Sequence, residues 1–541
     1  MLDSLLLFVT AMVISMAIVP LMIRIAPRVG MVDLPDPRKV HTIPIPRVGG
    51  IGIVIGAIIP VVLWLPFDPL VTSYIFGCLV LLVFGVWDDS RELGHYVKFV
   101  GQFLAVLPVV FYANIYVAEL PLFGDIPELA GKIFTVIAVV GMINATNHSD
   151  GLDGLAGGLS LLSLACIGYL MYLAGDTWMV FLVVSIMGGV FGFLRFNSHP
   201  AKVFMGDGGS QFLGFTLGFL AIVLTQKSNP ALSPALPLLF LGLPIADIIA
   251  VFYLRISGGM NWFKATRNHV HHRLLDLGFT HYESVIVIYL IQMLLILCSI
   301  LFMYEYDLLI LTIYFSVIIG VFASLTILER KGFKISRKSG TSLIEGFFTK
   351  TIKSKMLLRV LGNYIVLAIS LIFVSVSLLI DTVPTDIGYL SAFLIVCCIF
   401  VFAGFKKQLH IFMKLVLYVT AALSVYLDYL YLNHGNSLIV NIEIIIYILL
   451  AIAVVLIIKF DEKVDFSLSP LDYLMAIMVI IAFTVFNLSA ENLEYGNYML
   501  KLILLFYSCE LVEKRNVQGF KVVVLASLST LLILVYRVAI S

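Results

Sequence analysis

The chain has 541 residues, of which 61% are hydrophobic and only 12% are charged, and its formal net charge is +1. Because a soluble domain carries about 45–50% apolar and about 25% charged residues, this composition excludes an ordinary soluble protein. The near-neutral charge identifies no partner and gives no reason to expect nucleic-acid binding. Continuous apolar runs near 20 residues long predict spanning helices rather than the alternating strands of a barrel, so we expect an all-α polytopic membrane protein.

About eleven apolar runs occupy the first 330 residues, and each is close to the ~20 residues that cross the hydrocarbon layer. They fall at about 4–22, 49–66, 70–86, 99–116, 133–147, 157–174, 178–194, 211–226, 234–253, 283–304 and 307–328. Residues 1–330 are therefore expected to form one domain of about eleven transmembrane helices.

A basic segment at 331–359 separates this domain from the rest of the chain. It is predicted to be a cytoplasmic linker, with a helix lying on anionic lipid as the alternative. About seven further runs follow at 360–380, 388–404, 411–432, 438–459, 469–488, 497–511 and 519–537. They carry few polar residues and no recurring charged group. Residues 360–541 are expected to be accessory transmembrane helices, to which the sequence assigns no role.

The basic residues of the connecting loops in the first domain fall almost entirely in alternate loops. The rich set holds Arg24, Arg28, Arg38, Lys39, Arg47, Arg91, Lys98, Arg195, Lys202, Arg255, Lys264, Arg267 and Arg273. The other loops hold only Lys132 and Lys227. By the positive-inside rule, the rich set is cytoplasmic and the N-terminus lies outside. Five polar clusters belong to the loops predicted to be cytoplasmic.

Two of these clusters follow the first and third runs. Residues 33–50 contain prolines that cannot continue a helix, and Lys39 there could hold a phosphate, with a solvated loop as the alternative. Asp88 and Asp89 end the third run. Adjacent acids repel unless a cation or proton lies between them, which suits Mg²⁺, although helix termination in water also explains them. Lys98 could snorkel to the surface or meet a phosphate.

The richest polar stretch is residues 144–154, which reads Asn-Ala-Thr-Asn-His-Ser-Asp-Gly-Leu-Asp-Gly. Such polarity within a membrane protein is costly unless it serves a function. Its glycines let the backbone turn tightly and expose amide donors to a base or a phosphate. A role in an active site is therefore favoured over an ordinary loop.

The last two clusters flank the eighth and ninth runs. Residues 204–210, Phe-Met-Gly-Asp-Gly-Gly-Ser, favour a phosphate at a helix N-terminus with a metal ion on Asp207, and simple capping is the alternative. Residues 269–275, His-Val-His-His-Arg-Leu-Leu, follow Arg267 in a long loop. Three histidines beside arginine could donate to phosphate oxygens or relay a proton. Zn²⁺ suits them less, because no cysteine is near and the spacing is not that of a helix-face pair.

Taken together, the five clusters resemble the motifs of the polyprenyl-phosphate N-acetylhexosamine-1-phosphate transferases. This family is of glycosyltransferase family 4 type and is related to phospho-N-acetylmuramoyl-pentapeptide translocase. The resemblance covers residues 1 to about 330 and rests on the order and membrane placement of all five clusters. It implies an enzyme that transfers a sugar-1-phosphate from a UDP-sugar to polyprenyl (undecaprenyl) phosphate, the first membrane step of a cell-envelope glycan such as lipopolysaccharide.

The histidine motif also bears on the donor sugar. His-Val-His-His-Arg resembles the N-acetylhexosamine branch of the family, whereas the muramoyl branch has an unbroken run of three histidines. A UDP-N-acetylhexosamine donor is therefore expected, with a muramoyl-pentapeptide donor as the alternative within the enzyme class. A membrane transporter or flippase is the alternative from another class, but its polar groups are expected at mid-membrane depth rather than at helix ends.

The resemblance implies a role for each matching residue. Mg²⁺, or Mn²⁺ in its place, would be held by Asp207, Asp88 and Asp89. The catalytic residues would be Asp88, Asp89, Asp150, Asp153, His269, His271 and His272. The substrates would be contacted by Lys39, Lys98, Asn144, Asn147, Gly151, Leu152, Phe204 and Arg267. We expect this site on the cytoplasmic face of a bacterial inner membrane, with UDP-N-acetylhexosamine and polyprenyl phosphate lipid as partners and a homodimer as one assembly.

Overall fold

The computed structural model describes residues 2–35, 43–91, 93–259, 268–335, 355–380, 383–404, 409–431, 437–460, 493–515 and 517–540. Among these residues almost every element is a helix, and eleven helices are long and apolar enough to cross a membrane. The predicted all-α polytopic fold is therefore confirmed. The described residues divide into two compact units, one ending at residue 335 and the other beginning at residue 355.

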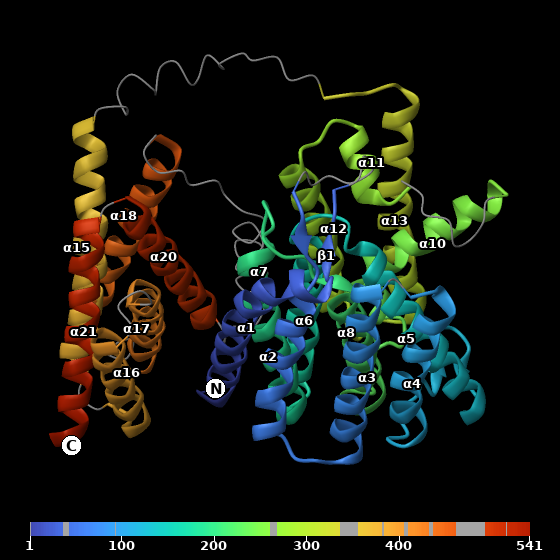
Figure 1. The fold of residues 1–541 in the computed structure, drawn as a ribbon, viewed down its shortest axis with the longest axis horizontal. Coiled ribbons are helices and arrows are strands. Elements are labelled where there is room, and N and C mark those ends of the chain that lie inside the picture. Colours follow the sequence, from blue (N-terminus) through green and yellow to red (C-terminus); the bar gives the residue numbers. More distant parts are fainter. Residues whose placement is uncertain are drawn as a thin grey trace. The chain divides into compact units, whose positions relative to one another are not determined.

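In the first unit each of the eleven predicted runs corresponds to helical structure (Figure 1). The helices are α1 (Leu2–Val29), α2 (Gly49–Trp64), α3 (Pro69–Arg91), α4 (His95–Phe111), α5 (Glu128–Ser149), α6 (Leu155–Leu173), α7 (Thr177–Asn197), α8 (Gly206–Val223) with the π-helical turn η1 (Leu224–Ser228), α9 (Pro237–Phe240), α10 (Gly242–Ser257), α12 (His281–Leu301) and α13 (Asp307–Arg330). The short helix α11 (Val270–Asp276) lies between α10 and α12.

The run at 234–253 was expected to form one helix, and this expectation is wrong. The helix is interrupted at Leu241, between α9 and α10. The carbonyl of Phe240 accepts hydrogen bonds from the Ser163 hydroxyl and the Gln292 amide, both at 2.7 Å. Side chains of α6 and α12 thus satisfy a backbone group that a continuous helix would satisfy internally, as buried non-helical backbone requires in a membrane.

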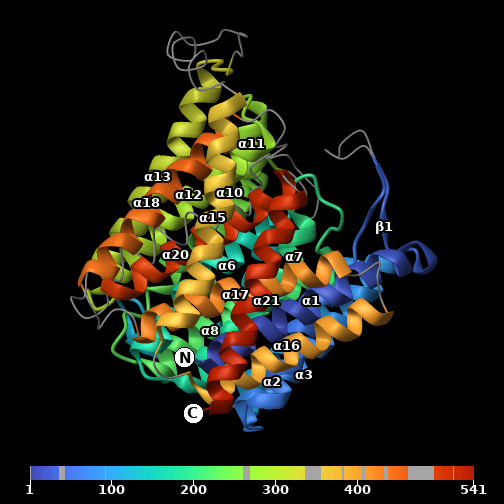
Figure 2. The ribbon, with the colours of Figure 1, turned by 90° about the vertical axis from the view of Figure 1, so that its left-hand side faces the viewer.

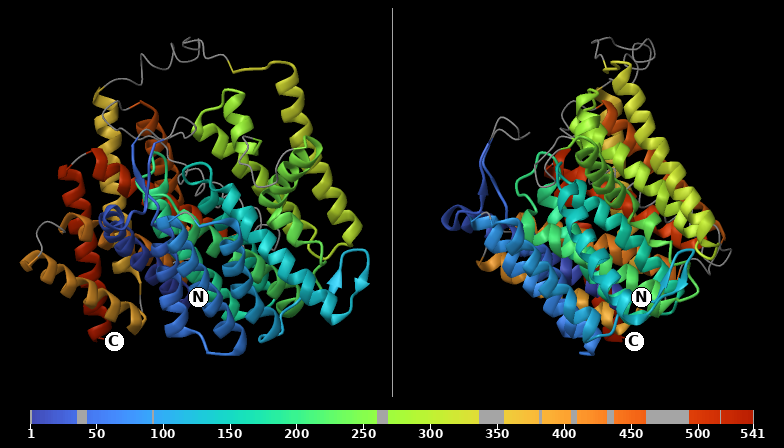
Figure 3. Two further views of the ribbon diagram at one scale, coloured as in Figure 1. Left: turned by 45° about the vertical axis from the view of Figure 1, so that its right-hand side comes forward. Right: turned by 90° about the vertical axis from the view of Figure 1, so that its right-hand side faces the viewer.

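Two small antiparallel ladders complete the first unit. Strand β1 (Val32–Asp33) pairs with β2 (Ile45–Pro46), and β3 (Glu119–Leu120) pairs with β4 (Gly124–Asp125). The β3–β4 hairpin is drawn in cyan in the left panel of Figure 3. The β1–β2 ladder orders both ends of the loop that follows α1.

Helix α8 is the core of the first unit, and its residues from Gly208 to Val223 are all buried. Small residues let neighbouring helices approach it closely. A Cβ on Gly85 of α3 would lie 2.2 Å from the Cα of Gly208, and a Cβ on Gly50 of α2 would lie 2.2 Å from the amide nitrogen of Gly209. The contact of α3 with α8 therefore sets the acidic end of α3 against the N-terminus of α8.

The second unit contains six described helices, which Figure 2 labels. They are α15 (Lys355–Leu379), α16 (Thr385–Gly404), α17 (Leu409–Tyr431), α18 (Ser437–Phe460), α20 (Leu493–Arg515) and α21 (Val517–Ile540). Each matches a predicted run, and the run predicted at 469–488 lies outside the described residues. Most of the predicted linker lies outside them as well, so the domain boundaries at 330 and 359 stay predictions.

Candidate active site

The N-terminus of α8 is capped by a carboxylate from α3. Asp89 Oδ1 accepts the backbone N–H of Asp207 at 3.0 Å, and Asp89 Oδ2 accepts that of Gly208 at 3.3 Å. Such bonds satisfy orphan amides of the first turn, and the helix dipole favours the negative charge. Gly206, with φ of +73°, permits this approach, since a Cβ there would lie 2.5 Å from Asp89 Oδ2.

One ammonium group joins the other two acids of the predicted metal site. Lys98 Nζ lies 2.6 Å from Asp88 Oδ2 and 2.7 Å from Asp207 Oδ2. The second oxygen of Asp88 accepts the backbone N–H of Leu93 at 2.6 Å, which fixes the direction of the carboxylate. Three helices, α3, α4 and α8, thus bring two carboxylates and one ammonium to a single point.

The donor set at this point fits a hard divalent cation. Mg²⁺ is bound in proteins by one or two carboxylates and completes its octahedron with water and substrate phosphate. Asp88 and Asp207 each aim an oxygen at one position, where the Lys98 ammonium already serves as a cation. Both oxygens of Asp89 instead accept backbone amides. Metal binding by Asp89 stays a prediction, whereas its contact with the start of α8 is a feature of the structure.

A polar chain extends from Asp207 into α4 and α5. The Gln211 amide donates to Asp207 Oδ2 at 3.3 Å, and the Gln102 amide lies 3.4 Å from Gln211 Oε1. Asn144 donates to Gln102 Oε1 at 2.9 Å. Asn147 accepts a hydrogen bond from the Ser210 hydroxyl at 2.8 Å. Asn144 and Asn147 therefore lie on the Asp207 side of the site.

Gln102 and Gln211 were not predicted as site residues from the sequence. Both are about 1% exposed and lie in apolar runs. The signal that could have found them is an amide side chain within a spanning run, which is costly unless it has partners.

The loop between α5 and α6 carries the predicted acid Asp150. Burial, followed by the charges of Asp207 and Asp153, raises the pKa of the Asp150 carboxyl to about 7. Gly151 lies against the histidines, since a Cβ there would be 2.2 Å from His271 Nε2. Leu152 is buried, and its carbonyl accepts the backbone N–H of Leu155 at 3.0 Å.

The three predicted histidines lie together on and before α11. The ring centroids of His269 and His271 are 5.6 Å apart, and those of His271 and His272 are 4.2 Å apart. His148, at the end of α5, stacks on His269 at 5.6 Å. Burial is the main cause that lowers the pKa of His271, to about 3, and His272 acts in the same direction, so His271 is neutral near pH 7.

An acid on α10 orients the first of these histidines. Asp247 Oδ2 lies 2.7 Å from His269 Nδ1, and Asp247 Oδ1 accepts the backbone N–H of Val270 at 2.8 Å. Asp247 and His269 are each about 6% exposed. A carboxylate on one ring nitrogen fixes the imidazole tautomer and its orientation, which leaves Nε2 for a substrate. Asp247 was not among the predicted residues because it is a single acid within an apolar run.

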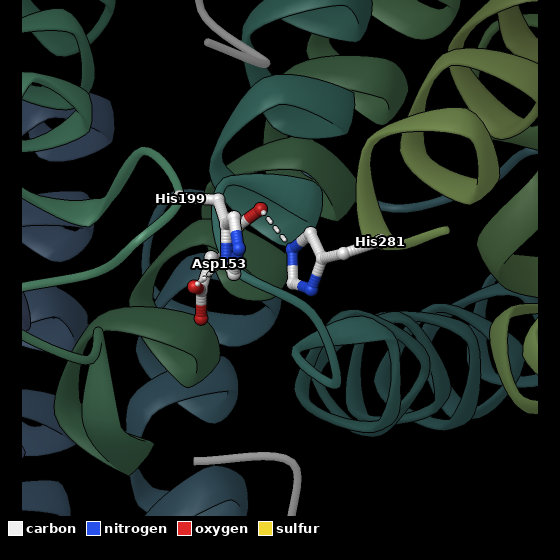
Figure 4. A group of neighbouring side chains, drawn as sticks. All are labelled: Asp153, His199 and His281. Carbon is white, nitrogen blue, oxygen red and sulfur yellow. Dashed lines mark hydrogen bonds and ion pairs between the residues drawn. The ribbon is translucent and has the colours of Figure 1, made fainter. Parts of the chain in front are cut away.

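The predicted residue Asp153 belongs to a second group with two histidines, which Figure 4 shows. Asp153 Oδ2 lies 2.6 Å from His199 Nδ1 and accepts the backbone N–H of Ala201 at 3.1 Å. The Asp153 carbonyl lies 3.3 Å from His281 Nε2. These bonds tie the start of α6 to the end of α7 and to the start of α12.

Asp153, His199 and His281 offer potential metal ligands that lie within 4.8 Å of one another. The two imidazole rings, however, stack at 4.1 Å with an interplanar angle of 21°. The lone pairs of an imidazole lie in the plane of its ring, so two nearly parallel rings do not converge on one ion as a tetrahedral site requires. The geometry favours a hydrogen-bonded support for the loop rather than a metal centre.

The backbone of Phe204 is held by the loop that follows α1. Its N–H donates to the Pro46 carbonyl at 2.8 Å, and its carbonyl accepts from Gly49 at 2.9 Å. Arg47 pairs with Asp33 across the β1–β2 ladder. The loop thus reaches the residues before α8. The predicted substrate contacts Lys39 and Arg267 lie outside the described residues.

Comparison with known proteins identifies relatives of the first unit. Residues 71–225 match the profile of glycosyl transferase family 4. The chain is 34% identical over 288 residues to the probable undecaprenyl-phosphate N-acetylglucosaminyl 1-phosphate transferase of Bacillus subtilis, a match that spans 52% of this chain and 80% of that protein. It is 30% identical over 280 residues to the undecaprenyl-phosphate alpha-N-acetylglucosaminyl 1-phosphate transferase of Escherichia coli O157:H7, spanning 50% and 76%.

A third relative is also similar to about half of the chain. The protein of that name from Haemophilus influenzae is 34% identical over 269 residues, which are 48% of this chain and 76% of the relative. These matches cover the N-terminal half of the chain and leave the C-terminal extension unassigned.

Proposed function

Because the chain belongs to glycosyl transferase family 4, we propose that it transfers N-acetylglucosamine-1-phosphate from a UDP-sugar to undecaprenyl phosphate. The products are undecaprenyl-diphospho-N-acetylglucosamine and UMP. The relatives' names, which specify this sugar and this lipid, support the assignment and do not favour a muramoyl-pentapeptide donor. They do not favour a transporter for the first unit either.

The observation that carries the proposal is the meeting of Asp88, Asp207 and Lys98 at one point beside the N-terminus of a buried helix. An acceptor phosphate and a donor diphosphate bring several negative charges together. Helix amides, an ammonium and a divalent cation are the groups that reduce this repulsion. We place Mg²⁺, or Mn²⁺ in its place, between Asp88 and Asp207, where it would supply charge neutralisation of the transferring phosphates.

The reaction exchanges one phosphorus–oxygen bond for another. An oxygen of the acceptor phosphate bonds to the sugar-bearing phosphorus of the donor, and the bond from that phosphorus to the oxygen of UMP breaks. UMP leaves with that oxygen. Because the second pKa of a phosphate monoester is near ~6, the acceptor is already ionised at neutral pH. A general base therefore contributes less than positioning and charge screening.

The chain's own residues supply this positioning. Lys98 would stay near Asp88 and Asp207. It would donate to a phosphate oxygen once a cation occupies the present position of its ammonium group. His269, oriented by Asp247 at Nδ1, would face the diphosphate with Nε2 and would donate to it when both ring nitrogens carry a proton. Asp89 would keep the amides of the first turn of α8 ordered beneath the phosphates.

The acceptor's lipid chain needs an apolar surface next to these charges. A cavity of about 420 Å³ lies beside the acidic end of α3, lined by Val86, Ser90 and Arg91 of that helix. Its other walls are mostly apolar side chains, including Met22 and Ile25 of α1. We place the first isoprene units of the acceptor here. We also propose that the active site faces the cytoplasm at the inner membrane, because the distribution of basic loops predicts this orientation.

The test is an assay of UMP release by the purified protein with undecaprenyl phosphate, Mg²⁺ and a panel of UDP-sugars. We expect turnover with UDP-N-acetylglucosamine, its loss on adding EDTA and its recovery when Mg²⁺ is restored. Turnover with a UDP-muramoyl-pentapeptide instead would overturn the donor assignment. Undiminished turnover in EDTA would overturn the metal assignment.

A further inference from the structure

Three ionisable side chains meet in the second unit, where no charged cluster was predicted. Lys501 Nζ of α20 lies 2.7 Å from Asp428 Oδ2 of α17 and 2.7 Å from Glu443 Oε1 of α18. The ammonium also lies over the rings of Tyr447 and Tyr498, at 5.4 and 5.7 Å from their centroids. The three helices that supply the group are labelled in Figures 1 and 2. We call Asp428, Glu443 and Lys501 the acid–lysine triad.

The triad is enclosed by apolar and aromatic side chains. Tyr447 and Tyr498 belong to a buried cluster that also contains Leu450, Ala453 and Leu505. Asp428 itself is 1% exposed. Charged groups in such surroundings lose most of their hydration, and an ion left there without a partner destabilises the fold.

The charges of the triad do not balance. When every group is ionised, two carboxylates face one ammonium, which leaves one net negative charge. Among the described residues, Lys501 is the basic group within ion-pair distance of Asp428 or Glu443. The next charged cluster, Lys414 with Glu510 and Glu513, lies near the other end of α17. Lys414 precedes Asp428 by 14 residues, which is about 21 Å of helix.

A second observation indicates how the excess negative charge is balanced. Asp428 Oδ1 is buried and has no hydrogen-bond partner within the described part of the chain, whereas Asp428 Oδ2 bonds Lys501. Two carboxyl groups that share one site cannot both stay ionised at low cost, and one proton between them removes the excess charge. Ionisable groups of this kind in membrane helices are typical of proton relays and ion pathways.

We propose that Asp428, Glu443 and Lys501 form a proton-binding site in the C-terminal helices, with one exchangeable proton shared by the two carboxyl groups. The other titratable groups that face it are Tyr447 from α18 and Tyr498 from α20. The second unit is then a proton-responsive part of the protein rather than an inert set of accessory helices. The site lies outside the transferase residues, so it stands or falls independently of the proposed function.

Infrared difference spectroscopy of the full-length protein in liposomes, recorded from pH 5 to pH 9, tests the proposal. We expect a protonated-carboxyl band at neutral pH that loses the intensity of one carboxyl in Asp428→Asn and the same amount in Glu443→Gln, while the contribution of Asp150, whose pKa is raised to about 7, stays unchanged. Each substitution leaves one acid and one ammonium, which balance without a proton. Asp386→Asn, which alters an exposed acid at the start of α16, is the matched control and should keep the band.

Lys501→Met gives a further check, because two acids without an ammonium should both be protonated and add roughly the intensity of one further carboxyl to the band. If one variant fails to insert, the other two decide the result. A band at neutral pH that neither acid variant weakens would overturn the proposal and leave the triad as a structural ion pair. UMP release in the same liposomes should be unchanged within about twofold in all variants, which separates this test from that of the transferase.

Discussion

Asp89 Oδ1 lies 3.0 Å from the backbone nitrogen of Asp207, so one acid of the expected metal site holds the helix that carries another. Asp89 therefore has a positional role whether or not it also touches the cation. The bond joins residues 118 positions apart in the chain. It ties the end of α3 to the start of α8.

Replacing Asp89 should damage the helix start before it damages cation binding. Loss of an N-terminal cap costs about 0.5–2 kcal/mol, so Asp89→Ala should lower the thermal unfolding midpoint and reduce turnover at least tenfold. Asp89→Asn keeps an acceptor oxygen and should recover part of both losses. The Mg²⁺ concentration for half-maximal turnover should stay within about threefold of the natural value in Asp89→Asn. A shift of a hundredfold would mean that Asp89 is a ligand of the ion.

Replacing Asp247 should act through His269. Asp247→Asn changes the hydrogen bond at His269 Nδ1 and so disturbs the tautomer that offers Nε2 to the substrate. Turnover should fall by roughly 10–100-fold, as is typical when the partner of a functional histidine is removed. The pH–rate profile should change shape as well, which mere loss of packing would not cause. Asp125→Asn, in the exposed β4 strand, is the control and should be neutral.

The pKa of Asp150 makes stability depend on pH. It is raised in the folded protein to about 7, whereas an unfolded Asp titrates near about 3.9. The folded state therefore holds the proton more tightly than the unfolded state. The resulting stabilisation of the fold is complete below about pH 4 and is lost as pH rises to about 7. Without divalent cations, the unfolding midpoint of the natural protein should fall over this range by more than that of Asp150→Asn. Equal slopes would show that Asp150 does not carry the effect.

Removing the second unit tests the predicted boundary. A chain that ends after Arg359 keeps all helices of the first unit, so we expect turnover within about threefold of the full-length protein. The measurement is UMP release at matched protein concentration, with circular dichroism as the control for helix content. A helical but inactive product would show that the C-terminal helices take part in the transferase reaction.

The helices were predictable from sequence, because lipid contact demands long apolar runs and gives each span a clear signature. The chemistry at the ends of α3 and α8 was also visible, because acids and glycines gather there in short motifs. Asp247 was not visible, since a lone acid in an apolar run gives no partner. Its role depends on how α10 packs beside α11, which no local pattern encodes.

The acid–lysine triad was missed for a similar reason. Asp428, Glu443 and Lys501 come from three separate runs, and Lys501 is 73 positions from Asp428. Each run read as an ordinary span with two charged residues. Only the packing of α17, α18 and α20 turns three isolated charges into one group.

The proposed reaction depends on a divalent cation held by Asp88 and Asp207 at the point where Lys98 lies. Electron paramagnetic resonance of Mn²⁺ bound to the purified protein measures this directly, without relying on turnover. We expect one bound Mn²⁺ per chain that Mg²⁺ displaces, with affinity reduced at least tenfold in Asp88→Asn and in Asp207→Asn. Undiminished Mn²⁺ binding in both variants, with the fold intact, would show that these two acids do not hold the ion.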